Sequence, residues 1–548
     1  MSILIPHGWR TRLHILSRSH RHLSILCAAI LIAGYAVATI IASTQDASRS
    51  AHDETAALRH YFAKGLREVD ASPKPHDREL AEWLYDLCED MPGTAVEWEL
   101  AVPTIDDFLK SGHIFEVKVR EAIEKHAGPQ DQQALFNDYV VASLEPKAPR
   151  GKDARKRIET AAQRIPPAPL ANEFLGHLLD DADLRMEALK AFQREGALPA
   201  ADHARDHALG LAIALGEVTV LREMLGQPLY RDEASGHQLL SAGALLGDWR
   251  MQIHGTLRGI GERARWDVVF VGLLAASLWY SVFVRFGDRR PWRWLTPIPA
   301  VIAGALSVGP TIMLVHYQDT VMGLTEHGGF PRDLIYYVAG VGLREELCKL
   351  ALFALFLPWL LRRRDPLKAL LTGAFVGLGF ALEENFGYYM RAGFDVATGR
   401  LLTANFFHAA LTAPAALALY EMIRTRFAKA EQFIGTFIAV VLAHGIYDWA
   451  FTGGQSLPFV GDISLISMVT LAFLANHFFH EVETMARPSG SVISLLSIFV
   501  VGSSLVVAIS LVMVAIETPS VMAVNSMAAS VVGYVPIVIF YLRRIGQL

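Results

Sequence analysis

The chain has 548 residues and a formal net charge of −5; 52% of its residues are hydrophobic and 19% are charged. A soluble chain usually carries about 25% charged residues, and here they concentrate between residues 45 and 265, with long apolar stretches on both sides. This distribution excludes a purely cytosolic enzyme, and the mild acidity speaks against nucleic-acid binding. It predicts an all-α, polytopic membrane helix bundle with one large extramembrane helical domain.

The N-terminal segment carries four arginines followed by an apolar run over residues 23–42. About 20 apolar residues exceed the roughly 7–15 of a signal-peptide core, and no small-residue cleavage site ends the run. An uncleaved anchor is therefore favoured over a signal peptide. We assign residues 1–44 to an N-terminal cytoplasmic tail and a membrane anchor helix.

Residues 45–265 show apolar residues at spacings of three and four, which predicts an extracytoplasmic helical domain. Leu215-Gly216-Glu217 recurs as Leu246-Gly247-Asp248. The recurrence indicates stacked helical hairpins of the tetratricopeptide kind, although chance similarity between two Ala/Leu-rich helices explains it equally well. The proline-rich segment 144–170 is expected to be an exposed linker.

Nine further apolar segments are long enough to cross about 30 Å of hydrocarbon. They are residues 267–284, 295–316, 333–361, 367–390, 401–423, 432–453, 458–480, 491–516 and 519–541. Basic residues gather after every second segment, which predicts about ten spans with both termini in the cytoplasm, in the cell's inner (plasma) membrane. We expect two spans in 266–330, a core in 331–455 and three spans in 456–548.

Four consecutive spans contain ionisable or strongly polar residues where lipid disfavours them. One such charge near the bilayer centre costs about 2.5–3.5 kcal/mol or more. Four spans with such groups must therefore face one another or a water-filled cavity. The residues are Arg344, Glu345, Glu346 and Lys349 in the fourth span, Glu383, Glu384, Asn385 and Tyr388 in the fifth, Asn405 and His408 in the sixth, and His444 and Asp448 in the seventh.

Helix geometry predicts which of these groups meet. Residues four apart share a helix face, which pairs Glu345 with Lys349, and His444 with Asp448. Glu384, His408 and His444 come out about 10–14 Å from the outer boundary at 1.5 Å per residue, so the cavity should open outward. Glu345 comes out nearer 18 Å, unless glycines at 340 and 342 break the helix before it.

Carboxylates beside imidazoles in a low-dielectric cavity suit the activation of water. A glutamate can take a proton from water and return it to a leaving amine, while Asp448 orients His444. Glu384, His408 and His444 could instead ligate a metal such as zinc and leave one position for water. The HExxH spacing is absent from the sequence, so neither mechanism is selected.

At these residues the sequence resembles the PrsW family of intramembrane proteases, within the wider group of CAAX proteases and bacteriocin-immunity membrane proteins. The family motifs EExxK, EExxxY and HxxxD correspond to 345–349, 383–388 and 444–448, with a membrane histidine between the last two. The resemblance covers residues 330–455. It implies hydrolysis of a peptide bond in a membrane-anchored protein substrate near the outer face, by a glutamate-type or metal-dependent mechanism. The implied catalytic centre is Glu345, Glu346, Glu383, Glu384, His408 and His444.

Other interpretations of the same residues stay open. The glutamates could be structural ion-pair partners of Lys349 and Arg344, and Tyr388 either donates to an oxyanion or packs as an aromatic ring. We take Lys349, Tyr388, Asn405 and Asp448 as supporting residues. A different class of function is a non-catalytic protein, either a proton-coupled transporter or a scaffold whose outer domain binds protein partners.

Overall fold

The computed structural model describes residues 7–48, 146–198, 201–262, 265–287, 291–326, 329–450, 464–486, 492–518 and 521–547, with short pieces between 134 and 143. Every regular element in these ranges is helical, which confirms the predicted all-α class. The chain divides into two compact units. The polar unit is Ser48–Met251, and the membrane unit is Met1–Ala47 together with Gln252–Leu548.

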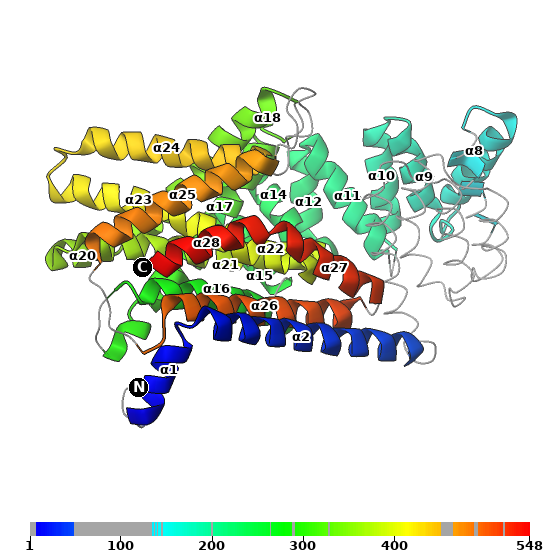
Figure 1. Ribbon diagram of the computed structural model, residues 1–548. Coiled ribbons are helices and arrows are strands. Elements are labelled where there is room, and N and C mark those ends of the chain that lie inside the picture. Colours follow the sequence, from blue (N-terminus) through cyan, green and yellow to red (C-terminus); the bar gives the residue numbers. More distant parts are fainter. Residues whose placement is uncertain are drawn as a thin grey trace. The chain divides into compact units, whose positions relative to one another are not determined.

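The polar unit is an array of short helices in which neighbours in the chain pack on one another (Figure 1). Its helices are α8 (Pro149–Ala162), α9 (Ala171–Asp181), α10 (Arg185–Gly196), α11 (Asp202–Leu215), α12 (Val218–Gly226), α13 (Pro228–Glu233), α14 (Gly236–Leu246) and the start of α15 (Trp249–Glu262). The open linker expected over 144–170 is wrong for most of its length. Ala154, Ile158 and Ala161 bury one face of α8, and Pro149 is tolerated because it begins the helix.

The repeated Leu-Gly-acid triplets occupy equivalent corners of this array. Gly216 ends α11 at a φ of +68° and Gly247 ends α14 at a φ of +66°. Each is followed after one residue by the next helix, and a left-handed residue at such a corner favours glycine. The recurrence therefore marks two helix ends of the same kind, each followed by a tight turn into the next helix, while the assignment to the tetratricopeptide kind stays a prediction.

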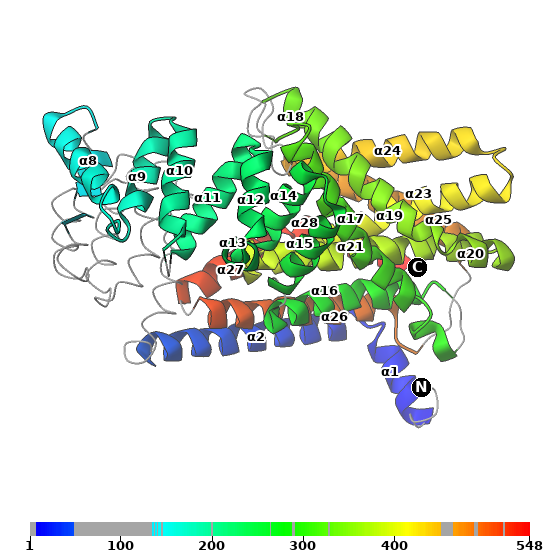
Figure 2. The same ribbon diagram turned by 180° about the vertical axis from the view of Figure 1, so that it is seen from behind.

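The membrane unit contains the remaining elements. They are α1 (His7–Leu16), α2 (His20–Ser48), the rest of α15, α16 (Trp266–Val284), η1 (Pro291–Trp294), α17 (Ile298–Thr320), α18 (Arg332–Ile335), η2 (Tyr336–Gly342), α19 (Leu343–Ala354), α20 (Leu357–Arg363), α21 (Pro366–Ala392), η3 (Phe394–Val396), α22 (Ala397–Leu402), α23 (Ala404–Arg424), α24 (Ala430–Asp448), α25 (Ser464–Met485), α26 (Leu495–Glu517), α27 (Val521–Gly533) and α28 (Val535–Gln547). The N-terminal helix α2 lies along the late helix α26 in both views (Figures 1 and 2).

Among the described residues, fewer helices have the length and hydropathy of a membrane span than the ten expected. Seven described helices are long and apolar enough to cross a membrane, or eight if the bent pair α27 and α28 forms one span. The expected spans 333–361 and 458–480 are outside this count. The first is divided into α18, η2, α19 and α20, and it carries the charged residues of the EExxK motif. The second corresponds to α25, whose C-terminal half holds histidines and glutamates.

Candidate active site

The first acidic pair is positioned by a local distortion of its helix. Glu345 and Glu346 lie in the first turn of α19, directly after η2, a π-helical turn; such turns often occur at functional sites. A Cβ added to Gly342 would lie 2.7 Å from the Val441 carbonyl oxygen, and one added to Gly445 would lie 2.6 Å from Val338 Cγ2. Glycines on both sides therefore let α24 approach η2 backbone to backbone.

The second acidic pair sits on α21, which is held close to α23 by small residues. Gly373 and Gly377 form a GxxxG spacing typical of close helix contacts in membranes. A Cβ at Gly377 would lie 2.6 Å from the carbonyl carbon of His408. The absence of a side chain there brings Glu384, two turns further along α21, within reach of the His408 ring.

The buried centre of the site is the Lys349 ammonium. Its Nζ atom donates to Glu346 Oε1 at 2.8 Å, to Glu345 Oε2 at 3.3 Å and to His408 Nδ1 at 2.9 Å. It also lies 3.8 Å from the centre of the Phe380 ring. Lys349 and Glu346 are completely covered by protein, so this ammonium ties three helices together without access to water.

Glu346 accepts hydrogen bonds from three sides. Besides Lys349, the Thr412 hydroxyl donates to its Oε2 at 3.2 Å and His444 Nδ1 lies 2.9 Å from its Oε1. The other ring nitrogen of His444 lies 3.2 Å from Asp448 Oδ2. A ring flanked by carboxylates at both nitrogens is a donor on both sides when it is protonated. Phe407 closes one face of this ring, at 5.4 Å between centroids.

The Glu384 carboxylate is bound by Arg400 and His408, at the side of the site that is less covered by protein. His408 Nε2 lies 3.0 Å from Glu384 Oε2, and Arg400 Nη2 donates to the same oxygen at 2.5 Å. Because Lys349 donates to His408 Nδ1, a neutral His408 carries its proton on Nε2 and donates it to Glu384. Arg400 also stacks on the Tyr388 ring, 3.6 Å from its centre.

Arg400 is a residue of this network that sequence reasoning missed. It lies one residue before the expected start of the sixth span, on the short helix α22, and a break at Thr403 separates it from α23. Its Nε donates to Asn385 Oδ1, and Asn385 in turn donates to Asn405 Oδ1 at 2.7 Å. The available signal was electrostatic: a glutamate buried in lipid needs a counter-cation, and no basic residue of the EExxxY motif itself supplies one.

The structure therefore brings most of the predicted site residues into one network. Its members are Glu345, Glu346, Lys349, Glu384, His408, His444 and Asp448, joined through Arg400 to Asn385, Asn405 and Tyr388. Glu383 is buried on α21, but it is about 100° around the helix from Glu384 and takes no part in the hydrogen bonds described above.

The donor set fits a divalent metal ion, with a ligand that differs from the predicted one. One ligand atom each from Glu345, His408 and His444 lies within 4.8 Å of the others, whereas tetrahedral zinc holds its ligands ~3.3 Å apart. Glu384, the carboxylate expected from the sequence, is instead engaged by Arg400. Because His408 Nδ1 accepts from Lys349, ligation through that atom displaces the ammonium.

The formal charge of the network is also compatible with a bound divalent cation. Glu345, Glu346, Glu384 and Asp448 supply four carboxylates, while Lys349 and Arg400 supply the two permanent cations paired with them. With neutral histidines the cluster has an excess of two negative charges in a buried setting. A divalent cation or two protons on the histidines would neutralise it.

The comparisons with known proteins agree with the resemblance stated from the motifs. Residues 290–476, about a third of the chain, match the family described as PrsW family intramembrane metalloprotease. No curated protein and no solved structure was found to match the chain.

Proposed function

We propose that this chain, whose residues 290–476 match the PrsW family of intramembrane metalloproteases, hydrolyses a peptide bond of a membrane-anchored protein substrate near the outer face of the inner membrane. One observation carries the proposal. Glu345 and His408 contact the buried Lys349 ammonium, while Glu384 contacts His408 and His444 contacts Glu345. Groups from α19, α21, α23 and α24 thus form one network, and carboxylates beside imidazoles suit the activation of water.

Glu384 is the proposed general base because it is the glutamate of the network that water can reach. A quarter of its side chain is left uncovered by protein, against 10% for Glu345 and none for Glu346. Its Oε2 atom is fixed by His408 and Arg400. Glu346, which is fully buried and bonded to donors on three helices, is a positioning residue in this scheme.

The proposed reaction follows from this geometry. Glu384 takes a proton from water as the water oxygen attacks the scissile carbonyl carbon, and the carbonyl becomes an oxyanion. Protonation neutralises Glu384, so the charge of Arg400 is no longer compensated and stabilises the oxyanion in the low-dielectric site. Glu384 then returns the proton to the departing amine nitrogen as the C–N bond breaks.

We include a metal-assisted form of this scheme because the donor set fits an ion. Glu345, His408 and His444 would hold zinc, which when bound polarises the carbonyl and lowers the pKa of water. Elemental analysis of the purified chain distinguishes the two forms. About one zinc per chain, lost in His444→Gln but kept in His477→Gln, is expected for the metal-assisted form; metal-free protein with full activity would refute it.

The wider layout is part of the same proposal. Basic residues after alternate predicted spans support cytoplasmic N- and C-termini and an outer location for residues 45–265. An outer domain built as an array of short helices suits recruitment or screening of protein substrates. Residues 331–455 would then be the protease core.

The experiment uses matched glutamine variants in the full chain. Protein N-termini are enriched from membranes of cells that produce the wild type, Glu384→Gln or Glu431→Gln, where Glu431 is exposed on α24. New N-termini in membrane proteins should appear with the wild type and Glu431→Gln and be absent with Glu384→Gln. Identical N-termini from all three would refute the proposed role of Glu384, and proton flux in proteoliposomes lost in Glu384→Gln would favour a transporter.

A further inference from the structure

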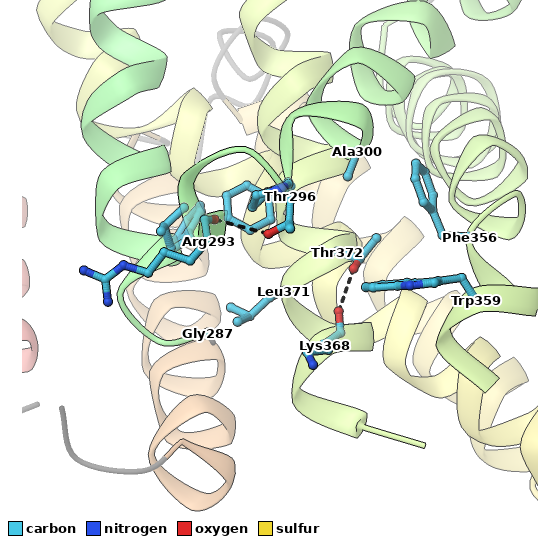
Figure 3. Close-up of a pocket in the computed structure, with 13 residues that line it drawn as sticks. Gly287, Arg293, Thr296, Ala300, Phe356, Trp359, Lys368, Leu371 and Thr372 are labelled. Carbon is cyan, nitrogen blue, oxygen red and sulfur yellow. Dashed lines mark hydrogen bonds between the residues drawn. The ribbon is translucent and has the colours of Figure 1, made fainter. Parts of the chain in front are cut away.

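A cavity lies in the membrane unit away from the proposed active site. It has a volume of about 90 Å³ and is lined by 13 residues from the end of α16, η1, the start of α17, α20 and the start of α21 (Figure 3). None of the lining residues belongs to the network around Lys349. A ligand in this cavity would therefore be separate from the peptide substrate.

The walls of the cavity are mostly apolar. Phe283, Phe356, Leu371 and Phe375 contribute side chains, and Trp359 lies as a flat indole at one side in Figure 3. The two threonine hydroxyls of the lining already donate to backbone carbonyls within their own segments. Apolar cavities stay dry and take up apolar ligands, so the wall chemistry fits a hydrocarbon chain better than water or a polar metabolite.

The rim of the cavity is basic. Arg293 and Lys368 belong to the lining, and both are labelled in Figure 3, where the Arg293 guanidinium extends outward from the other labelled residues. Across residues 285–287, 291–294 and 362–368 there are six arginines and lysines and one acid, Asp365. Asp365 lies 3.5 Å from Lys368 and caps α21. These segments therefore carry a net positive charge of five, of which Arg293 and Lys368 line the cavity itself.

We propose that this cavity binds one anionic glycerophospholipid. The acyl chain enters the apolar cavity and the phosphate lies between Arg293 and Lys368, with Trp359 at the level of the glycerol, where tryptophan is enriched in membrane proteins. Basic pockets between helices on the cytoplasmic side are suited to anionic headgroups, and the positive-inside rule assigns these arginines to that side. The positive rim repels the amine of a zwitterionic headgroup, so the lipid is anionic.

The bound lipid would connect two segments that carry the acidic motifs. The α20 residues of the cavity wall follow the helix with Glu345, and the α21 residues begin the helix with Glu384. A chain inserted between them fills a gap at the end of this helix pair. The consequence is a protein whose membrane unit unfolds at higher temperature in anionic than in zwitterionic bilayers.

The test uses the full chain in nanodiscs and native mass spectrometry. Wild type in phosphatidylcholine with added phosphatidylglycerol should retain one phosphatidylglycerol, and about tenfold less should be retained by the double variant Arg293→Gln/Lys368→Gln. The matched control Arg362→Gln/Arg363→Gln removes the same charge from the same end of the unit at exposed positions outside the lining, and should retain the lipid.

A second variant tests the cavity without changing charge. Thr296 is exposed at the mouth, so Thr296→Trp should leave folding intact, block entry of the acyl chain and lower retention to a similar degree. Equal loss in both double variants would mean a diffuse charge effect and would overturn the proposal. Displacement of the retained lipid by inorganic phosphate, or equal retention of phosphatidylcholine, would overturn it as well.

Discussion

The contact of α24 with η2 gives the sharpest test of how the site is assembled. An alanine Cβ at Gly445 would lie 2.6 Å from Val338 Cγ2 and 2.7 Å from the Tyr337 carbonyl oxygen, where carbon atoms prefer about 3.5–4.0 Å. The two backbones must therefore separate by on the order of 1 Å. His444 is the preceding residue, and its 2.9 Å contact with Glu346 would lengthen beyond the ~3.2 Å limit of a good hydrogen bond.

We expect Gly445→Ala to lower the rate of substrate cleavage about 10²-fold, as a misplacement of about 1 Å does in enzymes, and to cost ~1–3 kcal/mol of stability through overpacking. The control is Gly435→Ala on the same helix, where an added Cβ has nothing within 4 Å. Both variants are compared with the wild type for cleavage rate and thermal unfolding in one bilayer composition. Equal activity of the two variants would show that close packing of α24 on η2 does not position His444.

Three further outcomes follow from named contacts. Arg400→Lys keeps the positive charge beside Glu384 but loses one of the two side-chain hydrogen-bond donors, so it should lower the cleavage rate ~10-fold. The control Arg424→Lys changes an exposed ion pair and should have no measurable effect on the rate. Equal cleavage rates of the two variants would exclude a role for the guanidinium fork. Thr412→Val removes a hydroxyl donor to a fully buried carboxylate and should lower stability by ~1–3 kcal/mol, measured by thermal unfolding; an unchanged midpoint would contradict this. Burial lowers the pKa of His203 in the polar unit, so the unfolded unit binds more protons than the folded one just below the ordinary pKa of ~6.5. Hydrogen exchange in α11, corrected for intrinsic rates, should therefore be faster at pH 5.5 than at pH 7.5, and His203→Gln should reduce the difference.

The site was predictable where chemistry and helix spacing coincide. The lipid cost of Glu384, His408 and His444 identifies them as inward-facing, and helical spacing pairs Glu345 with Lys349. Both features are present in the structure. The first follows from the cost of a charge in lipid and the second from helix periodicity, and neither requires knowledge of the detailed packing. The predicted depth of Glu345 depended on a regular helix, and the π-helical turn before α19 is the type of break that the glycines at 340 and 342 allowed.

The features that the sequence did not predict depend on tertiary contacts or on segments that contain both charged and apolar residues. Arg400 reaches Glu384 only because the chain breaks between α22 and α23, and no periodicity marks that break. Hydropathy made the charged segment 333–361 a full span, although it is divided into four helical pieces. The position of Glu345 beside both histidines also depends on tertiary packing, because the two histidines come from α23 and α24.

The buried Lys349 side chain determines how the His408 ring is oriented in its hydrogen bonds. Lys349 has no exposed surface, and its ammonium is held in place by Glu346 and the Phe380 ring. Its donation to His408 Nδ1 leaves the proton of a neutral ring on Nε2, facing Glu384. The covered half of the network thus sets which atom of His408 meets Glu384, and the proposed function assigns the contact with water and substrate to the less covered half around Glu384.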